Sequence, residues 1–452
     1  MRALLVNPWI FDFAAYDFWL KPLGLLYVGA ALKKMGIEVE LIDLLNRHDK
    51  DLPKFTRVPK DKYYGTGKFP SKIIDKPEVL RKIPRNYKRY GAPEEYLEWK
   101  LANLDKPDIV FVTSSMTYWY PGVRATIHSI RNVLGNVPIV LGGVYARILP
   151  RHAQLKSGAD VIFRDSDLAK LGEVVSQLKR KHTEVPFKKW FQELDPAYEM
   201  YDRVGYLVFT TSVGCPYKCS YCISPKLWTY ERREPVRVVD TIEKYVNIFP
   251  VKDIVFFDDA ILVESERHFK PLLKELIARQ ISARFHLPNG VHARLIDEEV
   301  AELMKEAGFK TVRLGYETSG SLQIRTGGKV FDADVVRAAR ILRKSGFTPR
   351  EVQAYVMINM PGQSVEDIER AMKVCLNEGI SVSLNEYTPI KGTLDYTRLI
   401  EQNLLTEETD PLLLNNSVLP FWWENGMDAQ TVQRIKDTWR KLRNAYLSDT
   451  LC

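Results

Sequence analysis

Cysteine is scarce in this chain, because only 5 of the 452 residues are Cys, and an odd number this small does not build a disulfide framework. Long apolar runs are missing as well, since no stretch of 18 consecutive hydrophobic residues occurs. The amino-terminal residues also lack the long apolar core of a signal peptide. These absences exclude a disulfide-stapled secreted module and a membrane-embedded chain, so we expect a cytoplasmic protein without a transmembrane segment.

The overall composition is that of a globular protein. Hydrophobic residues make up 45% and charged residues 27% of the chain, which excludes a disordered polymer. At about 150 residues per domain the length allows about three domains with a sizeable buried core.

Positive charge is concentrated in one segment. Residues 47–91 contain 14 Lys or Arg against 5 Asp or Glu, a net charge of +9, while the whole chain carries +8, so the remainder is nearly neutral. The high pI therefore does not indicate a general affinity for nucleic acid, and no RNA-binding signature accompanies the Tyr residues interleaved there. Residues 65–68 read Gly-Thr-Gly-Lys, but no strand precedes them and Phe69 stands where a phosphate loop needs Ser or Thr.

The first region alternates strand and helix patterns. A helix is predicted over residues 22–36, where apolar residues recur every three or four positions and Lys33, Lys34 and Gly36 mark the end. The predicted strands are residues 3–7, 38–43, 108–115, 138–143 and 161–164. Each strand is apolar through its middle, which is typical of a doubly wound, Rossmann-like α/β domain, here residues 1–190 with a basic insertion over about 47–100.

A second block of strands and helices follows a linker predicted over residues 186–205. Its strands are expected at residues 206–212, 253–259, 283–290, 311–317, 352–359 and 381–387, and helices such as 297–308 and 331–346 separate them. Six such units make a partial barrel over residues 200–400, because a complete TIM barrel needs eight. Residues 401–452 are predicted to form a small helical extension with a polar helix near 431–447.

Three of the five cysteines fall within eight residues, as Cys215, Cys219 and Cys222. They follow the first strand of the partial barrel, where barrel enzymes place catalytic residues. A structural zinc site needs a fourth ligand from a second Cys pair or a His pair, and neither pattern occurs. Three thiolates can instead hold three irons of a [4Fe-4S] cluster and leave the fourth iron open to a substrate or cofactor.

This CxxxCxxC loop in a six-unit barrel resembles the radical S-adenosylmethionine (SAM) superfamily. The resemblance implies that the open iron binds the amino and carboxylate groups of SAM, and that one electron cleaves SAM to methionine and a 5′-deoxyadenosyl radical. Residues 256–259 stand at the family's SAM-amino motif, 315–319 resemble its Gly-x-Glu-Ser segment, and 359–363 resemble its Gly-Leu-Pro-Gly-Gln segment. The SAM-binding residues implied are Asp258, Asp259, Glu317, Ser319 and Asn359. The alternative for the two aspartates is a strand-end turn or helix cap.

The first domain resembles the cobalamin-binding domain of one branch of that superfamily. Residues 22–26, 113–117 and 142–143 match the branch's segments after its first, third and fourth strands. The cobalamin contacts implied are Pro8, Trp9, Leu23, Ser114, Ser115, Thr117, Tyr118, Gly142, Gly143 and Tyr145. No Asp-x-His-x-x-Gly motif supplies a lower axial ligand, residues 164–167 depart from the branch's Gly-Glu-Gly-Glu, and the aromatic residues could instead pack between domains.

The function implied is a cobalamin-dependent radical SAM C-methyltransferase that methylates an unactivated carbon. No single residue is assigned as catalytic. Cyclisation, rearrangement or C–C coupling is the first alternative, and a non-catalytic corrinoid or cluster carrier is the second. We expect a monomer that takes electrons from a donor such as ferredoxin or flavodoxin and acts on a small molecule, peptide or lipid. The basic insertion faces either that substrate or solvent.

Overall fold

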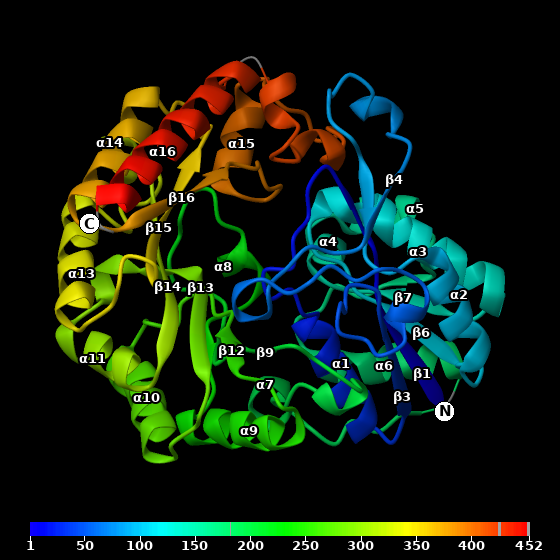
Figure 1. Cartoon of the computed structure of the whole chain (residues 1–452). Coiled ribbons are helices and arrows are strands. Elements are labelled where there is room, and N and C mark those ends of the chain that lie inside the picture. The colour runs from blue at the N-terminus through cyan, green and yellow to red at the C-terminus, as the bar shows by residue number, and fades with distance from the viewer. Residues whose placement is uncertain (181, 424–425, 450–452) are drawn as a thin grey trace. The chain divides into compact units, whose positions relative to one another are not determined.

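The structure is a computed structural model, and it describes residues 1–180, 182–423 and 426–449. The chain divides into two compact units, each with its own parallel sheet (Figure 1). Unit 1 comprises Met1–Val208 together with Lys244–Val251, and unit 2 comprises Phe209–Glu243 together with Lys252–Cys452. Each unit is described by itself below.

Unit 1 is built on a five-stranded parallel sheet with the strand order β3-β1-β6-β7-β8. The strands are β1 (Arg2–Asn7), β3 (Glu38–Asp43), β6 (Ile109–Val112), β7 (Ile139–Leu141) and β8 (Val161–Ile162). This order winds outward from β1 in both directions, so the predicted doubly wound domain is confirmed. The strands β6 and β7 are shorter than predicted, because the residues after Val112 and Leu141 leave the ladder to form loops at its carboxyl edge.

Helices α1 (Leu23–Lys34) and α3 (Tyr120–Leu134) connect strands of this sheet, and α6 (Leu171–Lys179) follows its last strand in the chain. In α1 the residues Leu25, Leu26 and Leu32 are buried, and the first and last of these belong to the core cluster that also contains residues of β1 and β6. The predicted helix over residues 22–36 is therefore confirmed, because its apolar face is the one that packs on the sheet.

The basic segment is more tightly integrated than an insertion exposed to solvent. Its strands β4 (Ser71–Ile73) and β5 (Lys88–Tyr90) form a three-stranded antiparallel sheet with β2 (Ile10–Asp12), in the order β2-β5-β4. The prediction that the segment simply faces substrate or solvent is thus wrong for its two ends. Between its ends many of its charged side chains lie on the surface, among them Lys54, Lys62 and Lys82.

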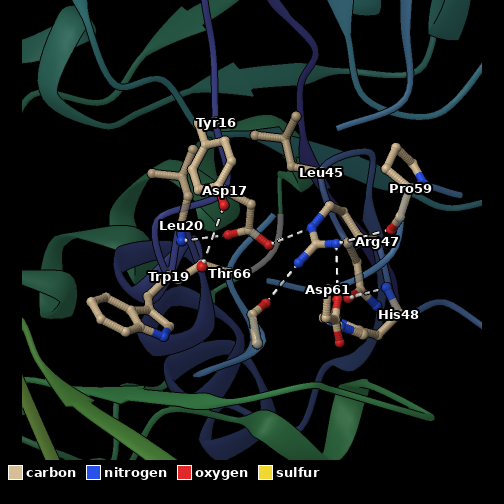
Figure 2. A network of polar contacts seen from close by, with 12 residues as sticks. Tyr16, Asp17, Trp19, Leu20, Leu45, Arg47, His48, Pro59, Asp61 and Thr66 are labelled. Carbon is tan, nitrogen blue, oxygen red and sulfur yellow. Dashed lines mark hydrogen bonds and ion pairs between the residues drawn. The ribbon is translucent and has the colours of Figure 1, made fainter. Parts of the chain in front are cut away.

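A buried ion-pair network fastens the start of this segment to the rest of unit 1 (Figure 2). Arg47 is 3% exposed, and it donates to Asp17 at 2.8 Å, to Asp61 at 2.9 Å and to the Gly65 carbonyl at 2.6 Å. Tyr206 donates its hydroxyl to the same Asp17. Because these partners lie far apart in the sequence, the network joins three separate segments of unit 1.

The predicted linker over residues 186–205 is part of the core of unit 1. It contains a short helix, α7 (Trp190–Glu193), and its side chains Phe187 and Leu194 belong to the same core cluster as α1. Tyr198 is fully buried, and its hydroxyl bonds both the N–H and the carbonyl of Val208. The aromatic residues that suggested a linker therefore act as core residues.

Unit 2 contains a six-stranded sheet whose strands follow chain order, β16-β15-β14-β13-β12-β9. The strands are β9 (Leu207–Phe209), β12 (Asp253–Phe256), β13 (Arg284–His292), β14 (Phe309–Glu317), β15 (Val352–Ile358) and β16 (Ser381–Glu386). The pairs from β12 to β16 are parallel, and the sheet does not close, so the predicted partial barrel is confirmed.

Helices cover the outer face of this sheet (Figure 1). They are α9 (Pro235–Ile248), α10 (Phe269–Ala278), α11 (Glu298–Glu306), α13 (Asp332–Lys344) and α14 (Val365–Asn377). Phe256, Phe285 and Phe309 stack across neighbouring strands, and Phe269 of α10 packs edge-on against Phe309. This aromatic layer fixes which face of the sheet meets the helices, and it leaves the polar side chains of the strands on the inner face.

The carboxyl-terminal region forms α15 (Leu394–Glu401), short turns and a long helix, α16 (Ala429–Asp449), where a polar helix near 431–447 was predicted. Lys436 of α16 pairs with Glu386 at the end of β16. Among the described residues, no helix is both long enough and apolar enough to cross a membrane.

Candidate active site

The three clustered cysteines lie on the loop that follows the first strand of the unit 2 sheet. The loop runs from β10 (Ser212–Val213) to α8 (Ser224–Leu227), and Cys215, Cys219 and Cys222 are all unpaired and half-buried. The N–H of Cys222 donates to the Cys219 carbonyl at 3.1 Å. Sequence analysis placed this loop correctly, at the carboxyl edge of the sheet.

The loop is suited to a polynuclear centre. Within the described residues, no three Cys, His, Asp or Glu side chains are arranged to hold a single metal ion. A [4Fe-4S] cluster needs a different arrangement, because each thiolate binds a different iron atom. Cys375 does not supply the fourth ligand of a zinc site, since its thiol is fully buried in α14.

A second segment, residues 326–329, packs directly on the cysteine loop. The Thr326 carbonyl accepts from the Ser220 N–H at 3.2 Å, and a Cβ placed on Gly327 would lie 3.4 Å from the Cys219 Cα. That distance is ordinary van der Waals contact, but Gly327 has a φ of +116°, so the backbone conformation here favours glycine. The segment ends at Lys329, whose Nζ lies 5.9 Å from the centre of the Tyr217 ring.

Lys329 is a site residue that sequence reasoning missed. Burial raises the pKa of Cys215 and Cys219, and the Lys329 charge opposes that rise at both thiols. Burial also raises the pKa of Glu317, and the same Lys329 charge opposes that rise. The available signal was the Gly-Gly pair that precedes Lys329, because glycine pairs are typical of turns and of close backbone approach.

Asp258, predicted to bind the SAM amino group, lies buried at the end of β12. One carboxylate oxygen, Oδ1, accepts from the N–H and the hydroxyl of both Thr211 and Ser212. The other, Oδ2, is buried without a hydrogen-bond partner among the described residues. Burial raises the pKa of Asp258 to about 6. One oxygen therefore orients the strand ends, and the other is free to accept from a bound ammonium group. Its neighbour Asp259 is exposed.

Glu317 stands at the end of β14 with a φ of +70°. Its side chain folds back over Gly315, because a Cβ on that glycine would lie 3.2 Å from Glu317 Oε1. Burial raises the pKa of Glu317 to about 7, so the carboxyl group is close to half-protonated at neutral pH. A hydroxyl group of a ligand would find either an acceptor or a donor there.

Two of the predicted SAM-binding side chains are already used within the protein. Ser319 has no solvent exposure, and its hydroxyl donates to the Asp367 carbonyl at 2.6 Å. Asn359 is 1% exposed, and its Oδ1 accepts from the Met427 N–H at 2.6 Å. Ser319 therefore anchors α14 and Asn359 holds the carboxyl-terminal region, and their contact with SAM stays a prediction.

His292, at the end of β13, was not singled out by the sequence. It is 4% exposed, and neither ring nitrogen has a hydrogen-bond partner among the described residues. Its ring lies 4.5 Å from that of Tyr217 in the cysteine loop. Burial and the charges of Lys329 and Arg294 lower the pKa of His292 to about 3, so the imidazole is neutral. Unsatisfied buried groups of this kind are expected where a ligand completes the site.

In unit 1 the candidate ligand site lies at the carboxyl edge of the sheet, in the loops after β6 and β7. Gly143 has a φ of +92°, and a Cβ there would lie 2.1 Å from the Ser114 carbonyl oxygen. The Ser114 hydroxyl donates to the Gly142 carbonyl at 2.5 Å. The two loops therefore meet backbone to backbone, which leaves Ser115 exposed and Thr117 half-buried.

Several predicted cobalamin contacts are core residues of unit 1. Trp9 is 1% exposed and donates from Nε1 to the Ala92 carbonyl at 2.6 Å. Tyr145 has no exposure, and its hydroxyl bonds His152 Nδ1 at 2.7 Å. Pro8 and Tyr118 are also buried, while Leu23, Gly142 and Gly143 are half-buried. The polar atoms of Trp9 and Tyr145 are thus used within unit 1, and the predicted cobalamin contacts stay predictions, with the exposed loop residues the most accessible of them.

Comparison with known families agrees with this geometry. Residues 209–375 match the family described as the Radical SAM superfamily. The chain thus contains a radical SAM domain, as its cysteine loop and partial barrel indicated.

Curated relatives match both units. An uncharacterized methyltransferase of Pyrococcus horikoshii is 24% identical over 382 residues, which cover 76% of this chain and 78% of the relative. An anaerobic magnesium-protoporphyrin IX monomethyl ester cyclase of Cereibacter sphaeroides is 25% identical over 348 residues, covering 68% of this chain and 55% of the cyclase.

Among solved structures, the radical SAM methyltransferase TsrM of Kitasatospora setae, solved with cobalamin and a [4Fe-4S] cluster, resembles this chain. The TM-score is 0.64 at 19% identity, and the match covers 89% of this chain and 78% of TsrM. The likeness confirms the predicted fold, a doubly wound domain followed by a partial radical SAM barrel.

Proposed function

We propose that this protein is a radical SAM enzyme that methylates an unactivated carbon of its substrate with the help of cobalamin. The observation that carries the proposal is the set of three half-buried, unpaired cysteines on one loop at the carboxyl edge of a partial barrel. Three thiolates leave one iron of a [4Fe-4S] cluster without a protein ligand, which is what SAM binding at that iron requires.

The residues of unit 2 suit this role. Cys215, Cys219 and Cys222 would hold the cluster, which supplies the electron that cleaves SAM. The unpartnered Oδ2 of Asp258 would accept from the SAM ammonium group, and Glu317 would bond a ribose hydroxyl. The half-buried cysteines remain partly accessible, as assembly of a cluster on their thiolates requires.

The loops of unit 1 suit a flat, bulky cofactor at the sheet edge. Gly142 and Gly143 present backbone without side chains, and Ser115 and Thr117 offer hydroxyl groups. Such surfaces allow close approach and hydrogen bonding to a cofactor tail. The methyltransferase names of the Pyrococcus relative and of TsrM, and the cobalamin in the TsrM structure, support the same assignment for this chain.

The proposal is tested by anaerobic reconstitution with iron, sulfide, SAM, cobalamin and a low-potential one-electron donor such as ferredoxin or flavodoxin. We expect about four irons per chain by chemical assay, bound corrinoid, and both 5′-deoxyadenosine and S-adenosylhomocysteine as products. Cys219→Ala removes the cluster, whereas the matched control Cys375→Ala, in α14, keeps it. A wild-type protein that binds neither cluster nor corrinoid contradicts the proposal.

A second candidate function is supported by the cyclase name of the Cereibacter relative. A cyclisation, rearrangement or coupling would use the same barrel and would yield 5′-deoxyadenosine without stoichiometric S-adenosylhomocysteine. A carrier without catalytic activity would form no 5′-deoxyadenosine under any condition. Measuring both products against substrate consumed therefore separates the three functions. Comparing the peptides, lipids and cofactors of cells with and without the protein would identify the substrate.

A further inference from the structure

Lys329 belongs to none of the predicted sets of cluster, SAM and cobalamin ligands. Its segment is fixed against the cysteine loop by two backbone contacts, the Ser220 N–H to Thr326 carbonyl bond of 3.2 Å and the packing of Gly327 on Cys219. These contacts place the backbone that carries Lys329 next to the cysteine loop, and the ammonium group lies 5.9 Å from the centre of the Tyr217 ring in that loop.

Lys329 carries a positive charge that acts on two nearby carboxyl groups, Asp259 and Glu317, and opposes the rise that burial causes in their pKa values. It forms no ion pair among the described residues, and its closest aromatic neighbour is Tyr217, which lies between Cys215 and Cys219 in the sequence. The nearby cation Arg294, in contrast, is paired with Asp334 at 3.4 Å and donates to the Gly328 carbonyl at 3.0 Å. His292 is neutral. Lys329 is thus a positive charge beside the three thiols that has no ion-pair partner among the described residues, and it is less exposed than Lys218 in the loop itself.

We propose that Lys329 is a positioning residue for electron transfer, a fixed cation beside the cysteine loop that raises the reduction potential of the [4Fe-4S] cluster. The inference rests on the proposed function, because it requires that cluster. It assigns to this chain a residue that sets how readily an external one-electron donor reduces the site.

The sign follows from elementary electrostatics. Three thiolates make the assembled centre anionic, and its one-electron reduction adds another negative charge with no bond formed or broken in the protein. A fixed positive charge stabilises the more negative, reduced state more than the oxidised state, so it raises the potential. Half-burial of the loop keeps this interaction from being fully screened by salt.

The experiment is an EPR-monitored redox titration of the reconstituted full chain in the absence of SAM. We expect Lys329→Gln to lower the ratio of reduced to oxidised cluster about tenfold at a fixed potential, equivalent to about 59 mV for one electron. Lys329→Glu lowers the ratio further, and Lys329→Arg restores it. The matched control is Lys218→Gln, which removes the same charge from an exposed side chain next to Cys219 and leaves the ratio within about twofold of wild type.

Iron and sulfide content is measured first for every variant. An unchanged potential in Lys329→Gln and Lys329→Glu overturns the inference, as does a shift that occurs only when SAM is present, since that would make Lys329 a ligand of SAM. If one variant fails to hold the cluster, the reduction potentials of the others still test the inference, because they should fall as the charge at position 329 goes from positive to neutral to negative. A wild-type chain that assembles no cluster contradicts the proposed function instead, so the two failures are distinguishable.

Discussion

Arg47 donates from Nε to Asp17 Oδ2 at 2.8 Å, and both side chains are almost without solvent exposure. Asp17 also accepts from the Leu20 N–H (Figure 2). It accepts from the Tyr206 hydroxyl as well, so its carboxylate is the shared acceptor of three segments. The pair therefore locks the start of the basic segment to residues that precede and follow it.

Breaking this pair should be costly. Asp17→Leu leaves the Arg47 charge buried with only its exposed partner Asp61, so we expect a loss of about 3–5 kcal/mol in the free energy of unfolding of unit 1, measured by denaturant titration. The double variant Asp17→Leu with Arg47→Met should lose less than the sum of the single variants. The control Arg2→Met breaks exposed pairs and should cost less than about 1 kcal/mol. Additive single losses would contradict the coupling.

Glu317 should make the stability of the apoprotein depend on pH. Its folded pKa of about 7 lies above the ordinary value of 4.5, so the folded state binds the proton more tightly and wild type loses stability as pH rises from 4.5 through 7. Glu317→Gln removes this loss. The free energy of unfolding of the variant, minus that of wild type, should therefore be up to about 3 kcal/mol larger above pH 7 than it is at pH 4.5. The exposed Glu306→Gln is the control, and parallel stability curves for Glu317→Gln and wild type would refute the prediction.

Asn359 should govern how firmly the carboxyl-terminal region is held. Its Oδ1 is the acceptor for the Met427 N–H, and its φ is +67°. Both Asn359→Gly and Asn359→Ala remove the acceptor, so hydrogen exchange at the Met427 amide should accelerate in both. The Ala variant should be less stable than the Gly variant by about 1 kcal/mol, because only Gly adopts this φ without strain. Unaltered exchange at Met427 would show that the bond does not hold the segment.

The ligand site of unit 1 should need Gly143 for two reasons, its positive φ and the close approach of the two loops. Gly143→Ala places a Cβ 2.1 Å from the Ser114 oxygen, whereas Gly36→Ala, at a φ of +73°, meets nothing within 4 Å. Both variants should lose about 1–2 kcal/mol in the free energy of unfolding, because a residue with a Cβ is strained at a positive φ. Only Gly143→Ala should also weaken corrinoid binding by at least about tenfold, measured by absorbance titration. Equal corrinoid affinities in the two variants would mean that the two loops do not form the site.

Much of the fold was predictable because it depends on local pattern. Buried strands of a parallel sheet are apolar throughout, so the five strands of unit 1 and the six of unit 2 stood out, and amphipathic helices such as α1 had a clear period. The cysteine loop was predictable for a related reason. Its three ligands lie within eight residues, and their spacing alone restricts the chemistry.

Side-chain roles that depend on distant partners were not predictable. Trp9, Ser319 and Asn359 stand in segments that resemble cofactor-binding motifs, yet each uses its polar atom on a carbonyl or N–H elsewhere in its own unit. A motif fixes where the backbone runs, and the packing around it decides which polar atoms remain for a ligand.

By itself, the sequence determined the two α/β units and the three-cysteine loop, because periodicity and spacing are local properties. Only the tertiary structure decided that the basic segment is fastened through Arg47, that the predicted linker is core, and that Lys329 lies beside the cysteine loop. The physical reason is common to all three. Burial, hydrogen bonding and electrostatic interaction are relations between residues that folding brings together across long stretches of chain.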